Sequence, residues 1–339
     1  MKITPEQLEI GSTQKRTRPE KREAFLRRIT HVSLVGKDIE SMDNLHFCKN
    51  LTVLYLYDNK ITKISGLECC RTLSRLYLQD NLIEEISGLD VGLDQLSILH
   101  LHNNRIRHVS GLQGLPALEQ VKLDRQRLDD GEALGFDLDS LSAIAPTLKQ
   151  LTVAGNRIAE LAPFEPLTQL ETLDLSENQL DDVQSLSSLL STFQRLQILN
   201  TSLNPLSGLP PAKLRQSLIL ACSSLETLND KPIPDVERKF AENLQRVTQQ
   251  RRKSSITTTT SGHPPSSKQS SAASALGCAA LQAPNAMHEK PIPHLPPYAT
   301  QYRDLLLSQL PAAAPPPQNR FRVGSAGNAA TATAAERGT

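Results

Sequence analysis

Three tyrosines that recur at matching positions in neighbouring segments are the residues of this sequence best suited to binding another molecule. Tyr55, Tyr57 and Tyr77 account for three of the five tyrosines in the 339-residue chain. Aromatic side chains that gather on a surface are typical of protein–protein contact sites. The alternative is structural, because tyrosine also suits the surface of a β-strand. Between the two interpretations we favour binding.

A pair of histidines offers the nearest approach to a metal site. His100 and His102 are separated by one residue, so on a strand both imidazoles would project from the same face. A zinc site needs at least one further ligand at a suitable spacing, and the sequence supplies none, so we predict no metal and no cofactor. The sequence also lacks GxSxG, HExxH and a phosphate-binding glycine loop. We therefore predict a binding protein that is not an enzyme.

The segments that hold these side chains repeat one pattern. Residues 51–61, LTVLYLYDNKI, have leucines at the first, fourth and sixth places, asparagine at the ninth and isoleucine at the eleventh. This is the pattern of a leucine-rich repeat, whose stacked units bury one shared core. Copies begin at Ile29, Leu51, Leu73, Leu96, Leu118, Leu148, Leu170 and Leu196. The predicted fold is an α/β solenoid of the 22-residue class, with a parallel concave sheet, 3₁₀ or short α-helices on the convex side, and helical caps.

The period of a strand assigns each place of the repeat to a side of the sheet. The fourth and sixth places point into the core, and the places on either side of them point outward. The outward places hold the tyrosines and histidines, together with a basic residue on the third repeat and an acidic residue on the seventh. We predict that a protein partner binds these concave-face residues: Tyr55, Tyr57, Arg75, Tyr77, His100, His102 and Asp174.

The ninth place predicts a ladder of side-chain amides, because an amide both donates and accepts hydrogen bonds. Six repeats have asparagine there: Asn59, Asn81, Asn104, Asn156, Asn178 and Asn204. We expect Lys37 and Gln126, which occupy this place in the first and fifth repeats, to interrupt the ladder. Beyond it, isoleucine and leucine recur at three-residue spacing in 61–67, 83–89 and 106–112, which suits short 3₁₀ segments.

Composition divides the chain into four predicted regions. Residues 1–28 form a basic segment with a capping helix, and residues 29–228 form the solenoid of about eight repeats, with an insertion at 129–147. Residues 229–250 form a C-terminal cap helix. Residues 251–339 are rich in proline, serine and alanine, and we predict a disordered tail because little apolar surface offsets its chain entropy.

Apolar spacing predicts which helices cover the ends of the stack. TRPEKREAFLRRI, residues 17–29, reads as a helix that starts near Thr17 and turns Phe25 and Ile29 inward. The insertion reads as a convex helix with apolar positions at 138, 141 and 144. The cap helix has its apolar row at i, i+4, i+8 and i+11, formed by Val236, Phe240, Leu244 and Val247.

Three weak motifs lie in the predicted tail. KPIPHLPP has the spacing of an SH3 ligand, YATQYRDLLLSQL could form a partner-bound helix, and Ser254 follows two arginines as in an arginine-directed kinase site. Such patterns are common by chance. They support no function by themselves.

Charge is unevenly distributed and argues against nucleic acid as a partner. Residues 1–28 have 8 Lys and Arg against 4 Asp and Glu, residues 29–250 have 20 against 29, and residues 251–339 have 9 against 3. Phosphate binding needs a basic face, which the acidic repeats lack.

The sequence has no apolar run long enough to span a membrane and no signal peptide, so we expect a cytoplasmic protein.

Several segments resemble the leucine-rich-repeat regulatory subunits of protein phosphatase 1. They are the isoleucine-containing repeats NKITKISGL, NLIEEISGL and NRIRHVSGL, the segment CKNLTVLYLYDN, the insertion QRLDDGEALGFD and the helix sequence VERKF. The resemblance covers about residues 20–245. It implies binding of the phosphatase 1 catalytic subunit through the concave face, and association with centrosomes and the microtubule cytoskeleton. An alternative is a microtubule-associated scaffold whose basic ends contact acidic tubulin tails.

Overall fold

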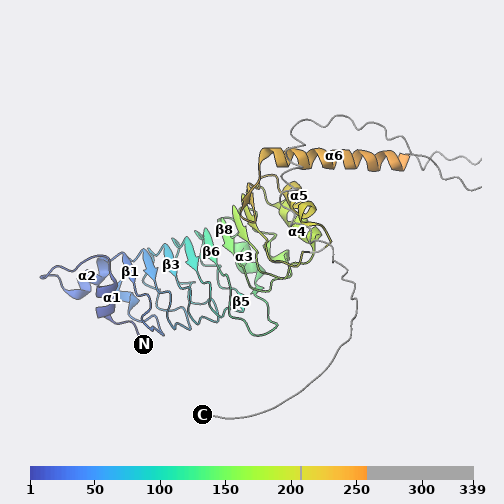
Figure 1. Ribbon diagram of the computed structural model, residues 1–339. Coiled ribbons are helices and arrows are strands. Elements are labelled where there is room, and N and C mark those ends of the chain that lie inside the picture. Colours follow the sequence, from blue (N-terminus) through green and yellow to red (C-terminus); the bar gives the residue numbers. More distant parts are fainter. Residues whose placement is uncertain (207, 258–339) are drawn as a thin grey trace, which may run out of the picture. The chain divides into compact units, whose positions relative to one another are not determined.

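The computed structural model describes residues 1–206 and 208–257, with side chains described as far as residue 250. In this part of the chain the strands form a ten-stranded sheet, which runs along one side of the stack in Figure 1. Neighbouring strands are parallel from β1 to β11, and only β12 is antiparallel. In sheet order the strands are β1 (His31–Ser33), β2 (Val53–Tyr55), β3 (Arg75–Tyr77), β4 (Ile98–His100), β6 (Gln120–Lys122), β8 (Gln150–Thr152), β9 (Thr172–Asp174), β10 (Ile198–Asn200), β11 (Thr227–Leu228) and β12 (Lys231–Pro232).

The leucines of the repeat form the core, as the pattern predicts. Leu51, Leu54 and Leu56 have 0% exposed surface, and the equivalent leucines of the other repeats are also buried. Each fully buried leucine stabilises the fold by roughly 1.5–3 kcal/mol relative to exposure. The core continues without interruption from repeat to repeat, so the stack is held together mainly by these rows of leucines.

The convex side differs from the prediction at three segments. Short 3₁₀ helices occur at η1 (Leu45–Phe47) and η2 (Ala162–Phe164). The prediction of 3₁₀ helices in 61–67, 83–89 and 106–112 is wrong, because these segments contain bends and irregular backbone, with a short strand at His108–Val109 in the third. A glycine explains the difference in each segment. Gly66 has φ +74°, and a Cβ there would lie 2.4 Å from the carbonyl oxygen of Met42. The chain therefore presses against the preceding repeat in a left-handed conformation that ends any regular turn.

The insertion adds structure on the convex side without disturbing the sheet. The predicted helix is present as α3 (Leu138–Ile144), which buries Leu141 and Ile144 but leaves Leu138 55% exposed. Before it, β7 (Gly135–Phe136) pairs with β5 (His108–Val109) in a separate two-stranded sheet, which the sequence analysis did not predict. On the other side β6 pairs directly with β8. The longer repeat thus keeps its place in the main sheet.

Two helices, rather than the single one predicted, cover the N-terminal end. The unpredicted helix α1 (Pro5–Gly11) buries Leu8 and is capped by Thr4 through a capping box with Gln7. The predicted helix, α2 (Arg22–Arg28), buries Phe25 but starts later than expected. Residues 17–20 instead form a turn, in which the Glu20 N–H donates to the Thr17 carbonyl at 3.0 Å.

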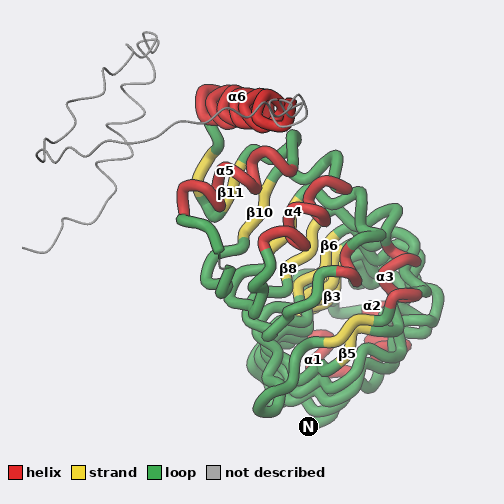
Figure 2. The backbone as a smooth tube through the Cα atoms, turned by 90° about the vertical axis from the view of Figure 1, so that its right-hand side faces the viewer, coloured by secondary structure: helices red, strands yellow, loops and turns green. Residues whose placement is uncertain are grey.

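Helices replace the convex loops toward the C-terminal end. Figure 2 shows α4 (Val183–Thr192) and α5 (Pro211–Ala221) side by side, with α6 (Asp235–Thr257) beyond them. The predicted C-terminal helix is therefore present, although it runs past the boundary predicted at residue 250. The prediction that its apolar row covers the stack is wrong for three of the four residues, whereas Phe240 is half-buried. Val236, Leu244 and Val247 are 51%, 45% and 44% exposed, whereas Ala241 is buried.

Polar side chains attach α6 to the stack instead. Arg215 of α5 makes two hydrogen bonds to the Glu237 carboxylate, from Nε at 2.7 Å and from Nη2 at 3.0 Å. The Arg238 guanidinium donates to the carbonyls of Ile219, Cys222 and Leu225. These carbonyls lie at and beyond the end of α5, where they have no partner within the helix. The apolar periodicity did not indicate this ionic attachment.

The amide ladder is longer than predicted, because Gln126 continues it. Asn104 is fully buried; its Oδ1 accepts from the Ile83 N–H at 3.1 Å, and its Nδ2 donates to the carbonyls of Leu78 and Leu101. Gln126 makes the equivalent bonds one repeat later, accepting from the Ile106 N–H at 3.0 Å and donating to two carbonyls. The predicted interruption there is wrong, since one additional methylene still lets the amide reach the same groups. In the first repeat Lys37 contributes only its backbone N–H, to Asn59.

None of the helices in the described ranges combines the length and the apolar character that crossing a membrane requires. The predicted tail beyond residue 257 and its SH3-type and helical motifs lie outside the described residues. The side chain of Ser254 is likewise not described.

Candidate protein-binding face

The sheet brings the outward side chains of successive repeats into straight rows. Tyr55 of β2 is directly opposite Tyr77 of β3, which is opposite His100 of β4. Lys122 of β6 follows in the same row. Because parallel neighbours lie about 4.8 Å apart, side chains in one row touch across the strands. We call the outward surface of this ten-stranded sheet the sheet face.

Five of the predicted residues form a continuous aromatic cluster on the sheet face. The rings of Tyr55 and Tyr77 are stacked, with centroids 4.8 Å apart and an angle of 13° between their planes. Tyr77 and His100 are edge-to-face with ring centroids 4.8 Å apart, and Tyr57 lies 6.5 Å from Tyr55 in the same kind of arrangement. His102 completes the cluster, 5.9 Å from His100. We call these five residues the aromatic ladder.

The aromatic ladder is rigid but still open to solvent. Its rings are half-buried, because each covers part of its neighbours. Stacked and edge-to-face pairs are each worth about 0.5–1.5 kcal/mol beyond the area that they bury, so the rings hold one another in place. Arg75 lies exposed on β3, two residues before Tyr77, and its guanidinium is available at the margin of the ladder.

Asp174 does not join this group. It lies in the same row as Tyr77 and His100, but on β9, beyond Lys122 and Thr152. Its carboxylate accepts from the backbone N–H of Ser176 at 2.9 Å and from the Ser176 hydroxyl at 2.6 Å. The structure therefore separates Asp174 from the other six predicted residues and gives it a local hydrogen-bonding role. Binding by any of the seven stays a prediction.

The histidines of the ladder are kept neutral by their surroundings. Burial lowers the pKa of His100 to about 4, and the nearby charge of Lys122 acts in the same direction. Burial also lowers the pKa of His102, although Asp124 and Asp80 oppose the shift. His100 Nε2 and His102 Nδ1 have no hydrogen-bond partner among the described residues. In the same part of the chain, no group of three potential metal ligands occurs.

The eighth place of the repeat is a structural feature that the sequence analysis missed. Every repeat has a left-handed backbone there, with φ between +51° and +68°. The residues are Gly36, Asp58, Asp80, Asn103, Arg125, Gly155, Glu177 and Leu203. Glycine, asparagine and aspartate tolerate this conformation best. The recurrence of these three residue types immediately before the ladder amide could have predicted the left-handed conformation. Leu203 departs most from it, since it is apolar and 77% exposed.

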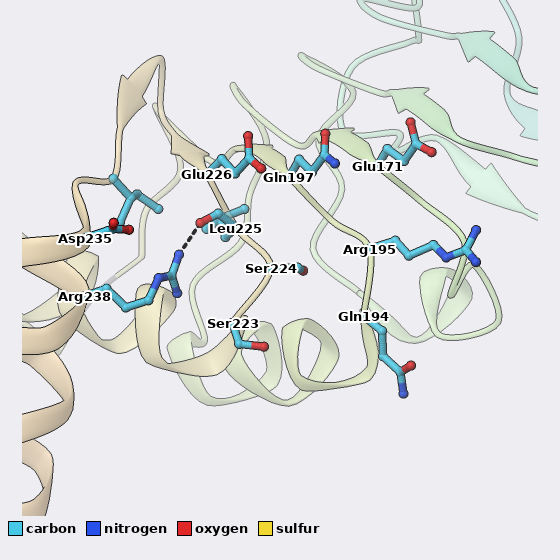
Figure 3. Close-up of a pocket in the computed structure, with 11 residues that line it drawn as sticks. Glu171, Gln194, Arg195, Gln197, Ser223, Ser224, Leu225, Glu226, Asp235 and Arg238 are labelled. Atoms are coloured by element: carbon cyan, nitrogen blue, oxygen red, sulfur yellow. Dashed lines mark hydrogen bonds between the residues drawn. The ribbon is translucent and has the colours of Figure 1, made fainter.

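A groove of about 670 Å³ lies where α6 attaches to the last repeats (Figure 3). Glu171, Gln197 and Glu226 line one wall, from the second places of successive repeats. Arg238 lies opposite and points its guanidinium at the Leu225 carbonyl, as the dashed line in Figure 3 shows. Because that guanidinium already bonds the end of α5, we assign the groove to the attachment of α6 and not to a ligand.

Comparison with known proteins identifies the class of fold to which the stacked repeats belong. Residues 49–91 and 146–188 match a family model described as leucine-rich repeats in two copies. Internalin C2 from Listeria monocytogenes has a similar structure, with 23% identity and a TM-score of 0.53 over 66% of this chain and 90% of its own. The chain therefore has the leucine-rich-repeat solenoid fold that the repeat pattern predicted. Proteins with this fold generally bind other proteins through an extended surface, and no enzymatic family is indicated.

Two further structures have lower TM-scores. The match to an internalin (inlF) from Listeria monocytogenes has 25% identity and a TM-score of 0.49, covering 61% of this chain and 62% of that one. A leucine-rich-repeat protein from Leptospira interrogans has 22% identity and a TM-score of 0.48, covering 60% of this chain and 50% of its own. The chain thus spans less than two thirds of the length of either structure. No curated protein matches the sequence.

Proposed function

We propose that this chain is a non-catalytic regulatory subunit that binds the protein phosphatase 1 catalytic subunit through the sheet face. The observation that carries the proposal is the aromatic ladder. Tyrosines concentrate binding energy at protein interfaces, and here three of them form one cluster with two neutral imidazoles. The phosphatase as partner comes from the resemblance of the repeats, the insertion and VERKF to its regulatory subunits, and to regulatory subunit 42 in particular.

Preorganisation supports binding at this position. Ordering a free side chain at an interface costs about 0.5–1.5 kcal/mol. Tyr55 and Tyr77 are already stacked on a regular sheet, so a partner that packs on them has little of this cost to overcome. A subunit bound in this way would act by occupying surface near the phosphatase substrate site and by redirecting which substrates reach it.

The alternative, a scaffold that binds microtubules through basic ends, receives less support. At the N-terminal end three arginines are already paired within the protein. Arg16 and Arg22 bind Glu9 at 2.6 and 3.0 Å, and Arg28 binds Glu20 at 2.7 Å. Their charge is partly neutralised before any tubulin tail could meet it. We propose a cytoplasmic location at centrosomes and the microtubule cytoskeleton, reached through the phosphatase complex, which localisation of a tagged chain would check.

Replacing Tyr55 and Tyr77 together with alanine tests the proposed function. Loss of one anchoring side chain costs about 2 kcal/mol or more, so we expect the affinity for the purified phosphatase 1 catalytic subunit to fall by at least about 30-fold. Calorimetric titration measures the affinity, and circular dichroism verifies that both proteins are folded. Lys63→Ala with Glu84→Ala is the matched control, because these exposed residues lie in the same two repeats but outside the sheet. Unchanged affinity in the tyrosine variant would refute the proposal.

A further inference from the structure

Neither the backbone conformation nor the packing at position 203 explains why a leucine is present there. It holds the eighth place of the last full repeat with φ +57° and leaves 77% of its surface exposed. The left-handed conformation costs an L-residue roughly 1–2 kcal/mol, a cost that asparagine and glycine avoid. An exposed leucine gains no burial energy in return. Backbone strain at a residue that the fold does not require indicates that the residue has a functional role.

Two charged side chains in the middle of the sheet face, those of Asp124 and Arg125, already have partners. Asp124 accepts from the Thr152 hydroxyl at 2.7 Å and from the Ala154 N–H at 2.9 Å. In the row of eighth places, Arg125 reaches past Gly155 to the Glu177 carboxylate at 2.8 Å. A Cβ on Gly155 would come within 3.0 Å of the Arg125 side chain. Asp124 and Arg125 of the central repeats are therefore already paired, although Lys122 beside them makes no ion pair among the described residues, and the aromatic ladder and the exposed apolar side chains of the last repeat lie on either side.

Those two regions are separated by a distance that a folded protein can span. From β2, which holds Tyr55, to β10, which precedes Leu203, the sheet advances six strands. At about 4.8 Å per strand the separation is about 29 Å, close to the diameter of a small domain. Ile198, 44% exposed on β10, adds apolar surface to the same repeat as Leu203. A peptide crossing between the two regions would instead run over Asp124 and Arg125, which are already paired.

We propose that Leu203 is a second anchor of the protein-binding face, inserted into an apolar pocket of the phosphatase 1 catalytic subunit while the aromatic ladder holds a separate point on the same molecule. This inference rests on the proposed function. Two anchors on a rigid sheet would fix the orientation of the bound subunit as well as its affinity. The strain at Leu203 is then retained because asparagine, which suits the backbone better, would remove the anchor.

Replacing Leu203 with asparagine separates this role from a structural one. We expect the Leu203→Asn variant to unfold at a higher temperature, because the strain is relieved, and yet to bind the phosphatase catalytic subunit about 10-fold or more weakly. Leu203→Gly should show the same combination. Leu138→Asn is the matched control, since Leu138 is also exposed but lies on α3 away from the sheet, and its affinity should equal that of the unchanged protein.

Thermal unfolding and calorimetric titration of the full chain give outcomes that can be told apart. Weaker binding of Leu203→Asn together with higher stability supports the second anchor. Binding equal to that of the unchanged protein overturns it while leaving the proposed function intact, and lower stability overturns it because Leu203 would then serve the fold. If the unchanged chain does not bind the phosphatase at all, both the proposed function and this inference are wrong.

Discussion

Replacing Asn104 with alanine should destabilise the solenoid far more than its small change in volume suggests. The side chain is 0% exposed; it accepts from the Ile83 N–H and donates to the Leu78 and Leu101 carbonyls at 3.0 and 2.9 Å. Alanine leaves the Ile83 N–H buried without its partner and removes one hydrogen bond from each carbonyl, which still accepts from Asn81 or Gln126. The unsatisfied N–H costs about 1 kcal/mol or more, and each of the two lost hydrogen bonds about 1 kcal/mol, so the free energy of unfolding should fall by about 3 kcal/mol.

Thermal and urea unfolding of the full chain measure this loss. For a folded unit of this size, about 3 kcal/mol lowers the midpoint of thermal unfolding by about 6–12 °C. Arg105→Ala is the matched control, because its neighbouring side chain is exposed and the change should be nearly neutral. A loss below about 0.5 kcal/mol for Asn104→Ala would refute the reasoning. It would mean that water replaces the amide in the turn, and that the ladder contributes little to stability.

Two further predictions concern Gly111 on the convex side and the half-buried His100. Gly111→Ala should reduce the free energy of unfolding by about 2 kcal/mol or more in urea titrations, because the added Cβ would lie 2.4 Å from the Ile86 carbonyl oxygen at φ +74°; stability equal to that of the unchanged protein would contradict the packing described. His100, whose pKa is lowered by burial to about 4, binds fewer protons in the folded than in the unfolded chain between pH 4 and its ordinary value near 6.5, so the fold should lose stability as pH falls through this range. His100→Gln should reduce this dependence, and an NMR titration that gives an ordinary pKa for His100 would exclude it.

The periodic features of this chain could be predicted from the sequence, and the individual contacts between repeats could not. The place of each leucine followed from the period of a strand, and so did the outward rows that unite Tyr55 and Tyr77. These predictions need only the local geometry of the backbone. Gln126 was not predicted to join the amide ladder, because only asparagine was expected to make these hydrogen bonds. The bonds require only that the side-chain amide reaches the same backbone groups, and the amide of Gln126 does so.

The errors at the C-terminal end have a different origin. Apolar spacing correctly predicted that residues from 235 onward form a helix, but it could not show which side of the helix meets the stack. Arg215 and Arg238 determine which side of the helix packs against the stack. Their partners are a carboxylate and backbone carbonyls that lie close together only in the folded protein. The distance of Asp174 from the tyrosines follows from the order of the repeats, but the predicted site combined residues by their place in the repeat and not by distance.

The direct pairing of β6 with β8 across a 30-residue step means that the two sides of a repeat can change independently. Evolution, or a protein engineer, could lengthen a loop on the back of the solenoid and leave the spacing of the strands unaltered. Conversely, side chains on the sheet could be exchanged row by row without redesigning the loops behind them. New partner preferences could therefore arise by surface substitution alone.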